Sequence, residues 1–512
     1  MIQKLLHVML VLGVLASILV GCGPADTSTP AAPEPTSAAV DEPAGDEPVE
    51  TEPPATDVPQ AEEEEREAVA LTLAHVQGEW LWPVLEELAA MYNEVSGNTV
   101  ELLYVPADGW AEWLQAQLVA GTEPDIIWMH GDAASLYRNQ QIIDLRPYFE
   151  SVSPYTGAPW QDSFLEGLLA GVIDPDGGEG MIGMPLAQVT VNLYYNRDIF
   201  AEAGLPDEAP LSWTGVLEAC QTVQAEMDDV TPFAVMNSIS WNLGWFRPQF
   251  MEDLYVNSGI VEKLDIITPN GKLENTEIAL GLKTGVIDPE DPRFVDYYAF
   301  MKELSQCFNK GFNVVSWEYE KLFLDGQAAM WLNGSWFPNQ LLTADVDLNY
   351  GVGPIPYVDD AVSEFSRNQA MKYALGVGAP NVLITKRAAD EGRAEAAVNF
   401  LQFWSDPATG AEYFVENTMF LPVVKNVAVP AEMQGIVDWI GDAEQVTNVN
   451  AVWALTPESG DKYSEMFKVF LEDDTSAEDF AADVADILLD AADQYIMENP
   501  DLDIESYVDQ VQ

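Results

Sequence analysis

The feature that most constrains the fold is a regular alternation of short apolar runs and amphipathic segments that begins at Val69. Three β-like runs, 69–74, 99–105 and 125–129, are separated by segments whose apolar residues recur at helical spacing, 82–95 and 110–118. This rhythm predicts an α/β fold with a parallel sheet flanked by helices. Ligands bind beyond the carboxyl ends of the strands in such sheets, so the residues after each run are the first candidates for a site.

The first residues of the chain indicate export. A basic residue, Lys4, precedes an unbroken apolar stretch, Leu5–Val20, which is too short for a comfortable membrane span and is typical of a secretory signal peptide. The stretch ends in Leu19-Val20-Gly21-Cys22, which resembles a bacterial lipobox. The resemblance implies cleavage after residue 21, a lipidated Cys22 and an extracytoplasmic protein anchored to the cell envelope. The alternative is a plain signal peptide with an incidental cysteine.

Residues 22–67 are predicted to form a disordered tether. They are rich in Pro, Ala, Thr, Glu and Asp and contain almost no large apolar residue, so they cannot bury enough surface to offset the entropy of ordering. The remaining part of the chain is long enough for two domains with their own cores.

Composition limits the partners. The formal net charge is −64 with only 21 Lys and Arg, which disfavours nucleic acid as a partner because its binding requires a clustered basic surface. Beyond the tether the cysteines are Cys220 and Cys307, and export permits a disulfide, although both could equally be small buried groups. No zinc-like spacing occurs and His75 and His130 are the only histidines after the signal, so we expect neither a metal centre nor a cofactor.

Several motifs in order resemble the family-1 extracellular solute-binding proteins, the substrate receptors of bacterial ABC importers, and within them the maltose-binding and other sugar-binding proteins. The motifs are Gly121–Ile127 (GTEPDII), Leu193–Leu205 (LYYNRDIFAEAGL), Phe323–Met330 (FLDGQAAM), Asn333–Trp336 (NGSW), Tyr350–Pro356 (YGVGPIP) and Phe400–Trp404 (FLQFW). The resemblance implies a monomer that binds a small carbohydrate and delivers it to a permease.

The resemblance also implies two α/β lobes with the ligand held between them, the type II periplasmic-binding-protein fold. We expect the N-terminal lobe to comprise residues 68–187 and about 377–447, and the C-terminal lobe residues 188–376 and about 448–512. The crossings between them are expected near Pro185–Thr190, near Leu375–Ala379 and around Val446–Val452.

A sugar requires a flat aromatic side chain for its apolar ring face and polar partners for its hydroxyl groups. Trp336 is the leading candidate, because in maltose-binding relatives the tryptophan of the Gly-x-Trp turn stacks on the ligand. Asp132 follows, because the first lobe of the family often presents an acidic hydroxyl acceptor after its Pro-Asp strand. The other candidates are Glu79, Trp80 and His130 in the first lobe and Trp241, Asn242, Trp245 and Asn333 in the second.

Simpler roles exist for some of these residues. Trp80 could pack against the first helix, Asp132 could cap the helix that begins at Ala133, and His130 could be an ordinary loop histidine. The acidic loop 174–180 lacks the alternating ligands of a calcium site and is better explained as a hairpin turn.

Two other functions compete with sugar binding. A polyamine or betaine-like cation would suit an aromatic box with carboxylates, whereas a phosphorylated or carboxylated ligand is disfavoured because few Lys or Arg follow the predicted strands. A surface-anchored glycoside hydrolase would need two carboxylates that face each other across the cleft. Glu79 and Asp132 could be imagined in that role, but both come from the same lobe, and the sequence contains none of the common catalytic motifs.

Overall fold

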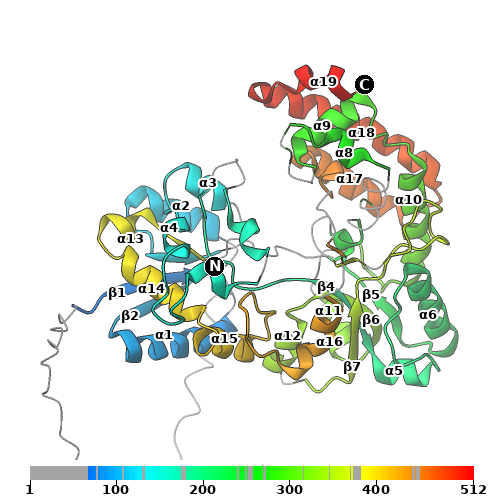
Figure 1. Ribbon diagram of the computed structural model, residues 1–512. Helices are drawn as coiled ribbons and strands as arrows, with labels where there is room; N and C mark the ends of the chain where they lie inside the picture. The colour runs from blue at the N-terminus through cyan, green and yellow to red at the C-terminus, as the bar shows by residue number, and fades with distance from the viewer. Residues whose placement is uncertain are drawn as a thin grey trace, which may run out of the picture. The chain divides into compact units, whose positions relative to one another are not determined.

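The computed structural model describes residues 67–76, 79–106, 109–129, 133–165, 167–174, 180–238, 242–247, 251, 258–267, 269, 273–314, 316, 318–344, 346–369, 371–372, 382–440, 444–445 and 450–511. Within them lie two four-stranded sheets, each with its own helices and its own main apolar core (Figure 1). We call the parts built on these sheets the first lobe and the second lobe. The α/β prediction with two lobes is therefore confirmed. The predicted signal peptide, Cys22 and the tether up to residue 66 lie outside the described residues.

The first lobe has a sheet with strand order β2-β1-β3-β9. Its strands are β1 (Ala70–His75), β2 (Thr99–Tyr104), β3 (Ile126–Trp128) and β9 (Val382–Ile384). β1 runs parallel to β2 and β3, as predicted, whereas β9 runs antiparallel to β3. The sheet is therefore mixed, and its antiparallel strand β9 comes from a distant part of the chain.

Helices of the first lobe come from two separate stretches of sequence. Those of the first stretch are α1 (Trp82–Ser96), α2 (Trp110–Ala120), α3 (Ala133–Arg138) and α4 (Arg146–Phe149), and those of the second are α13 (Lys386–Asp390), α14 (Ala394–Trp404) and α15 (Gly410–Thr418). Short 3₁₀ turns are η1 (Glu79–Leu81), η2 (Trp160–Ser163) and η3 (Leu168–Val172). Figure 1 shows α14 and α15 in yellow beside the blue α1, and the contacts between these helices bear this out.

The aspartate of the GTEPDII motif joins the two stretches. Asp125 is 1% exposed, and its carboxylate accepts hydrogen bonds from the backbone N–H and the hydroxyl of Thr72 on β1. The guanidinium of Arg393, just before α14, pairs with the same carboxylate at 2.6 Å. Asp125 is therefore a structural residue of the first lobe.

The second lobe has a sheet with strand order β5-β6-β4-β7. Its strands are β4 (Val191–Asn196), β5 (Thr231–Ala234), β6 (Ala328–Gly334) and β7 (Tyr350–Pro354). β4 is antiparallel to β6 and β7, and β5 is parallel to β6. Every residue of β4 and β6 is buried, so both strands form the centre of the lobe.

The helices of this lobe are α5 (Arg197–Glu202), α6 (Trp213–Glu226), α8 (Ile260–Leu264), α9 (Asn275–Thr284), α10 (Pro292–Leu304), α11 (Glu318–Leu324), α12 (Phe337–Ala344), α16 (Ala431–Ile440), α17 (Pro457–Phe470), α18 (Ala477–Glu498) and α19 (Val508–Val511). Local sequence explains two of the helix starts. Asn196 of the LYYNRD motif caps α5 by accepting hydrogen bonds from Asp198 N and Ile199 N, and the Ser212 hydroxyl caps α6 by accepting from Gly215 N. The short 3₁₀ turns are η4 (Leu243–Trp245), η5 (Ser305–Cys307), η6 (Asn450–Ala454), η7 (Pro500–Leu502) and η8 (Ile504–Tyr507). Two further short strands, β8 (Met371–Lys372) and β10 (Glu444–Gln445), pair in parallel with each other.

A disulfide joins Cys220 on α6 to Cys307 at the end of η5, with the two Cα atoms 6.0 Å apart. The sequence left open whether these cysteines form a disulfide or are separate buried groups, and the structure contains the disulfide. It fixes the segment that follows Cys307 against the helix that covers β5.

The first crossing between the lobes is visible in the hydrogen bonds. Met184 pairs with Val382 of the first sheet, Gln188 N donates to Leu421 O, and Thr190 O accepts from Ser335 N at the end of β6 in the second lobe. The chain therefore passes between the sheets within the predicted segment. The predicted second crossing, Leu375–Ala379, lies outside the described residues.

The predicted third crossing at 446–452 lies partly outside the described residues and stays a prediction. Helix α16 packs against β7, and its Met433 and Ile436 belong to a cluster that includes Val352 of that strand. In the first lobe, Asp174 N donates a hydrogen bond to Gly180 O, so the two ends of the predicted hairpin turn pair with each other.

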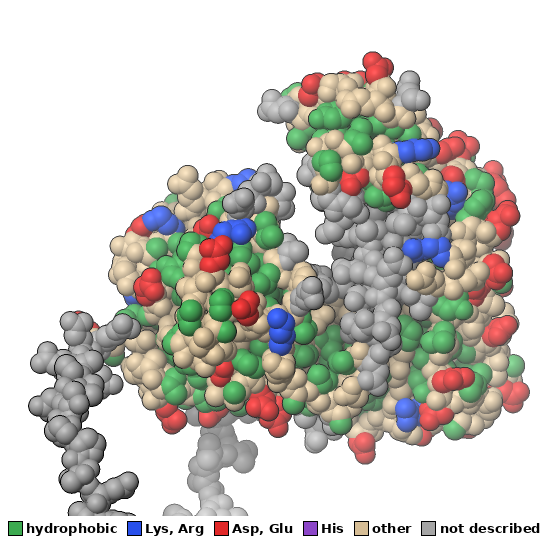
Figure 2. Space-filling model, in the orientation of Figure 1, with side chains coloured by type: hydrophobic (Ala, Val, Ile, Leu, Met, Phe, Trp, Pro, Cys, Tyr) green, Lys and Arg blue, Asp and Glu red, His purple; other side chains and the backbone are tan. Residues whose placement is uncertain are grey.

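Figure 2 shows acidic side chains scattered over the visible faces of both lobes with few Lys or Arg among them, as the net charge of −64 requires. Among the described residues, no helix combines the length and apolar character needed to span a bilayer.

Candidate functional site

A pair of indoles lies at the end of β6 in the second lobe. Trp336 is partly buried and its ring meets the edge of Trp245, with the ring centroids 6.1 Å apart and the planes at 76°. Trp245, on the turn η4, is 2% exposed. The sequence placed both residues in the site, and the structure brings them together although they are far apart in the chain.

Gly334 makes the position of Trp336 possible. The indole folds back over this glycine so closely that an alanine Cβ there would lie 2.0 Å from Cζ3 of the ring. Because only a residue without a side chain leaves this space, the glycine of the NGSW motif has a direct role in placing the indole.

A buried polar network supports the same turn. Thr190 O accepts from Ser335 N at 2.8 Å, and the hydroxyl of Tyr194 donates to Gly334 O at 3.0 Å. Burial raises the pKa of Tyr194 well above its usual range, so the hydroxyl remains a donor at neutral pH. Asn333 donates through Nδ2 to Gln340 Oε1 and accepts from Gly334 N.

Asn242 fixes the turn that carries Trp245. Its side chain is fully buried, accepts from Met236 N at 3.0 Å and donates to Leu332 O of β6 at 2.9 Å. Its backbone adopts a positive φ of 43°, a conformation that asparagine tolerates better than most residues. Asn242 and Asn333 thus have their amide groups engaged within the protein and hold the indoles in place.

In the first lobe, aromatic side chains align across the carboxyl ends of the parallel strands. His75 of β1 is opposite Tyr104 of β2 and Trp128 of β3, and its ring lies 5.5 Å and 6.3 Å from theirs. Trp82 at the start of α1 approaches the same imidazole at 6.2 Å. We did not predict this row, although each member ends a predicted strand or follows it directly.

Trp80, the described candidate of this lobe, is partly buried and its ring meets the edge of Phe420 at 6.1 Å. Glu79 begins η1, but its side chain lies outside the described residues, as do His130, Asp132 and Trp241. The residues of the second lobe are therefore seen to converge, whereas most of those predicted for the first lobe remain predictions.

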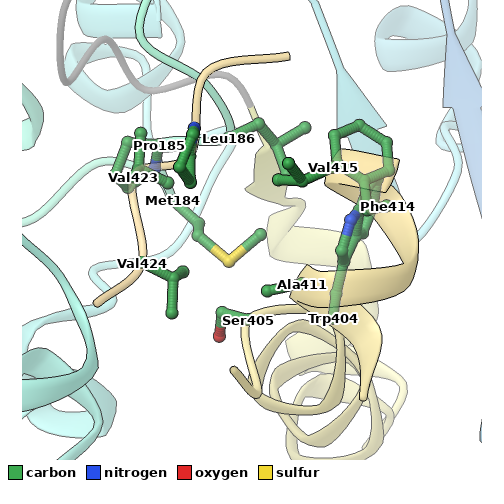
Figure 3. Close-up of a pocket in the computed structure, with 11 residues that line it drawn as sticks. Met184, Pro185, Leu186, Trp404, Ser405, Ala411, Phe414, Val415, Val423 and Val424 are labelled. Carbon is green, nitrogen blue, oxygen red and sulfur yellow. The ribbon is translucent and has the colours of Figure 1, made fainter. Parts of the chain in front are cut away.

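A small apolar cavity lies beneath the first crossing. Figure 3 shows Met184 reaching into it between Val424 on one side and Trp404 and Phe414 on the other. Its volume of about 20 Å³ is about enough for one water molecule, so it is too small for a sugar. Among the described residues there is also no group of His, Cys, Asp and Glu that could hold a metal ion.

Two mixed α/β sheets, each the centre of a lobe, with a partly buried indole at a strand end, define a two-lobed binding protein of the periplasmic type. Residues 75–411 match the family described as bacterial extracellular solute-binding protein, and the chain belongs to this family. Its members are non-catalytic binding proteins that act outside the cytoplasm, so the hydrolase alternative is wrong.

Curated relatives are distant. The chain is 24% identical over 307 residues to the sn-glycerol-3-phosphate-binding periplasmic protein of Brucella abortus, an alignment that covers 57% of this chain and 65% of that protein. The chain thus spans slightly less than two thirds of the length of this relative. It is 22% identical over 375 residues to the galactooligosaccharide-binding protein of Bacillus subtilis, covering 68% of this chain and 80% of the relative.

Solved structures share the fold. A cyclic α-maltosyl-1,6-maltose binding protein from Arthrobacter globiformis superposes with a TM-score of 0.57 at 18% identity, covering 84% of this chain and 100% of that chain. The raffinose complex of the solute-binding protein RafE superposes with a TM-score of 0.60 at 16% identity, covering 83% and 100%. At these identities the likeness concerns the fold alone.

Proposed function

We propose that this protein captures a sugar or oligosaccharide between its two lobes and delivers it to the permease of an ABC importer. The observation that carries the proposal is the partly buried indole of Trp336, which lies over Gly334 at the end of β6 and is supported by the buried Trp245. Indole faces suit the apolar face of a sugar ring. The names of the relatives agree, since they include binding proteins for galactooligosaccharides and for a cyclic maltosyl-maltose.

The first lobe would supply the opposite wall of the site. The segments that follow its parallel strands carry the predicted contacts Glu79, Trp80, His130 and Asp132. At the strand ends His75 and Trp128 are buried, so they would support these segments rather than touch the ligand. A ligand that touches both walls would favour a closed arrangement over an open one, because it gains contacts only when both are in reach. The first crossing at 185–190 would then serve as one of the hinges.

The anchor completes the proposal. A lipidated Cys22 at the end of the apolar stretch would hold the protein at the outer face of the membrane, and the acidic, proline-rich residues 22–67 would give the lobes reach toward the permease. Mass spectrometry of the membrane-extracted protein would detect the lipid on a peptide that begins at Cys22. An unmodified mature N-terminus at another residue would refute this part.

Ligand binding is tested first by thermal shift against maltotriose, raffinose, galactotriose, glycerol-3-phosphate, spermidine and glycine betaine. We expect a neutral oligosaccharide to raise the melting temperature, and Trp336→Ala to abolish that rise. Trp113→Ala, which removes a partly buried indole on α2 of the first lobe, is the matched control and should keep the response. Stabilisation by spermidine or betaine alone would discard the carbohydrate.

A further inference from the structure

Arg247, just beyond the turn that carries Trp245, is a buried cation. It is 4% exposed, and its guanidinium carbon lies 5.6 Å from the ring centroid of Trp453 and 5.7 Å from that of Tyr463. Across the described part of the chain, no carboxylate forms an ion pair with it. Contact with aromatic faces offsets only a part of the cost of withdrawing such a charge from water. The guanidinium therefore has no counter-charge among the described residues.

The terminal nitrogens of Arg247 are the part that a ligand can reach. Nε is sealed from solvent and has no hydrogen-bond partner among the described residues. Nη1 and Nη2 also make no hydrogen bond to the described residues, but they keep some contact with solvent. The small exposed area of this side chain thus includes its terminal fork. A guanidinium fork presents two parallel N–H donors that match the oxygens of a carboxylate or a phosphate.

The described groups next to the guanidinium are aromatic and neutral. Burial raises the pKa of Tyr297 to about 12, and the positive charge of Arg247 opposes part of that rise. Burial also raises the pKa of Tyr463 well above its usual range, so both hydroxyl groups stay protonated at neutral pH. Both hydroxyl groups are sealed from solvent, and the indole Nε1 of Trp453 donates to the hydroxyl of Tyr298 at 2.9 Å. None of these groups supplies a negative charge to the fork.

We propose that the Arg247 fork binds an oxyanion, a carboxylate or a phosphate group. The group could belong to an acidic sugar, which rests on the proposed function, or to a free inorganic anion, which does not. The sequence argued against an acidic ligand because few cations follow the predicted strands. Arg247 is a helical residue just after the turn η4 and not at a strand end, so that reasoning did not consider it.

Calorimetric titration with two probes, inorganic phosphate and trigalacturonate, tests the proposal at constant ionic strength. We expect at least one probe to bind wild-type protein and to lose about tenfold or more in affinity in Arg247→Gln, since a hydrogen bond to a charged group contributes about 1.5–3 kcal/mol. The methyl ester of trigalacturonate, which lacks the charge, should not depend on Arg247. Arg293→Gln is the matched control, because Arg293 also stacks on an aromatic ring, 4.6 Å from the centroid of Phe365, but already pairs with Asp291.

The two sources of the oxyanion give different results. Arg247-dependent binding of phosphate identifies a free anion, and Arg247-dependent binding of trigalacturonate alone identifies the acid group of a sugar. Binding of neither probe, or equal affinities in wild type and Arg247→Gln, overturns the proposal. If Arg247→Gln does not fold, Arg247→Lys keeps the charge and removes the planar fork, and an unchanged affinity for both probes in that variant also overturns it. Neutral oligosaccharides are titrated into the same variants, so failure of the proposed function is seen separately.

Discussion

Substitution of Gly334 by alanine should weaken sugar binding without unfolding the protein. The new Cβ would lie 2.0 Å, 2.2 Å and 2.2 Å from three atoms of the Trp336 ring. To restore an ordinary contact of 3.4 Å the ring must withdraw by about 1.4 Å. Gly334 pairs with Val191 on β4, and a strand position of this kind accepts alanine, so the indole is the part that has to move.

The expected loss follows from the energy of aromatic stacking. A well-placed aromatic contact contributes about 0.5–1.5 kcal/mol beyond its buried area, which corresponds to a loss of about 2- to 12-fold in affinity. Calorimetric titration with the oligosaccharide that gives the largest thermal shift measures this loss. The melting temperature and the far-UV circular dichroism of the variant should remain close to those of the wild type.

A double-mutant cycle separates displacement of the indole from other effects of the alanine. Trp336→Ala removes the ring, so adding Gly334→Ala to that background should change the affinity no further. Two results would refute the reasoning: wild-type affinity in Gly334→Ala, or a double variant that binds clearly more weakly than Trp336→Ala alone.

Three further predictions concern stability. Arg393→Ala should lower the free energy of unfolding by about 3 kcal/mol in chemical denaturation, because it leaves the buried carboxylate of Asp125 without its cation. Asp125→Asn should lower it less, because the guanidinium of Arg393 that it leaves unpaired reaches water. Equal losses in the two variants would contradict this. Replacing Cys220 and Cys307 by serine should lower the free energy of unfolding by about 2–5 kcal/mol relative to the oxidised wild type in chemical denaturation. The reduced wild type should show the same loss, and a serine variant as stable as the oxidised protein would contradict this. Burial raises the pKa of Glu320 to about 7 from 4.5, so this carboxyl group ionises at lower pH in the unfolded state than in the folded state. The melting temperature of the wild type should therefore fall between pH 5 and pH 8. Glu320→Gln should reduce this fall, and an unchanged pH profile would refute the prediction.

Much of the fold could be predicted because its elements have strong local signals. Helices α1 and α2 and the strands β1, β2 and β3 differ from the predicted segments only at their ends. The antiparallel β9 was harder, because the direction of a strand depends on how distant segments pack and leaves no local pattern. The packing of α16 on β7 was not predicted for the same reason, because nothing within α16 shows which strand its apolar face contacts.

The site was predictable where a motif carries it. Trp336 follows Gly334 in a recognisable turn, and the structure gives that glycine a steric reason to be there. The aromatic row at the ends of the first-lobe strands was missed because an aromatic residue that ends an apolar run has the same pattern as a core residue. Only the register of His75 with Tyr104 and Trp128 shows that the three form a row.

The position of the indoles depends on a chain of buried contacts that begins far from them. The disulfide at Cys307 holds the segment whose Asn309 accepts a hydrogen bond from Val235 N, directly after β5. The next residue along, Met236, donates to Asn242, which in turn is bonded to β6 and carries the turn of Trp245. A left-handed backbone at a residue other than glycine costs of order 1 kcal/mol or more, so Asn242 keeps it only because these contacts offset the strain. A rigid indole pair lets a sugar bind without first ordering the aromatic surface, and this accounts for the placement of buried amides, rather than apolar side chains, beneath the candidate site.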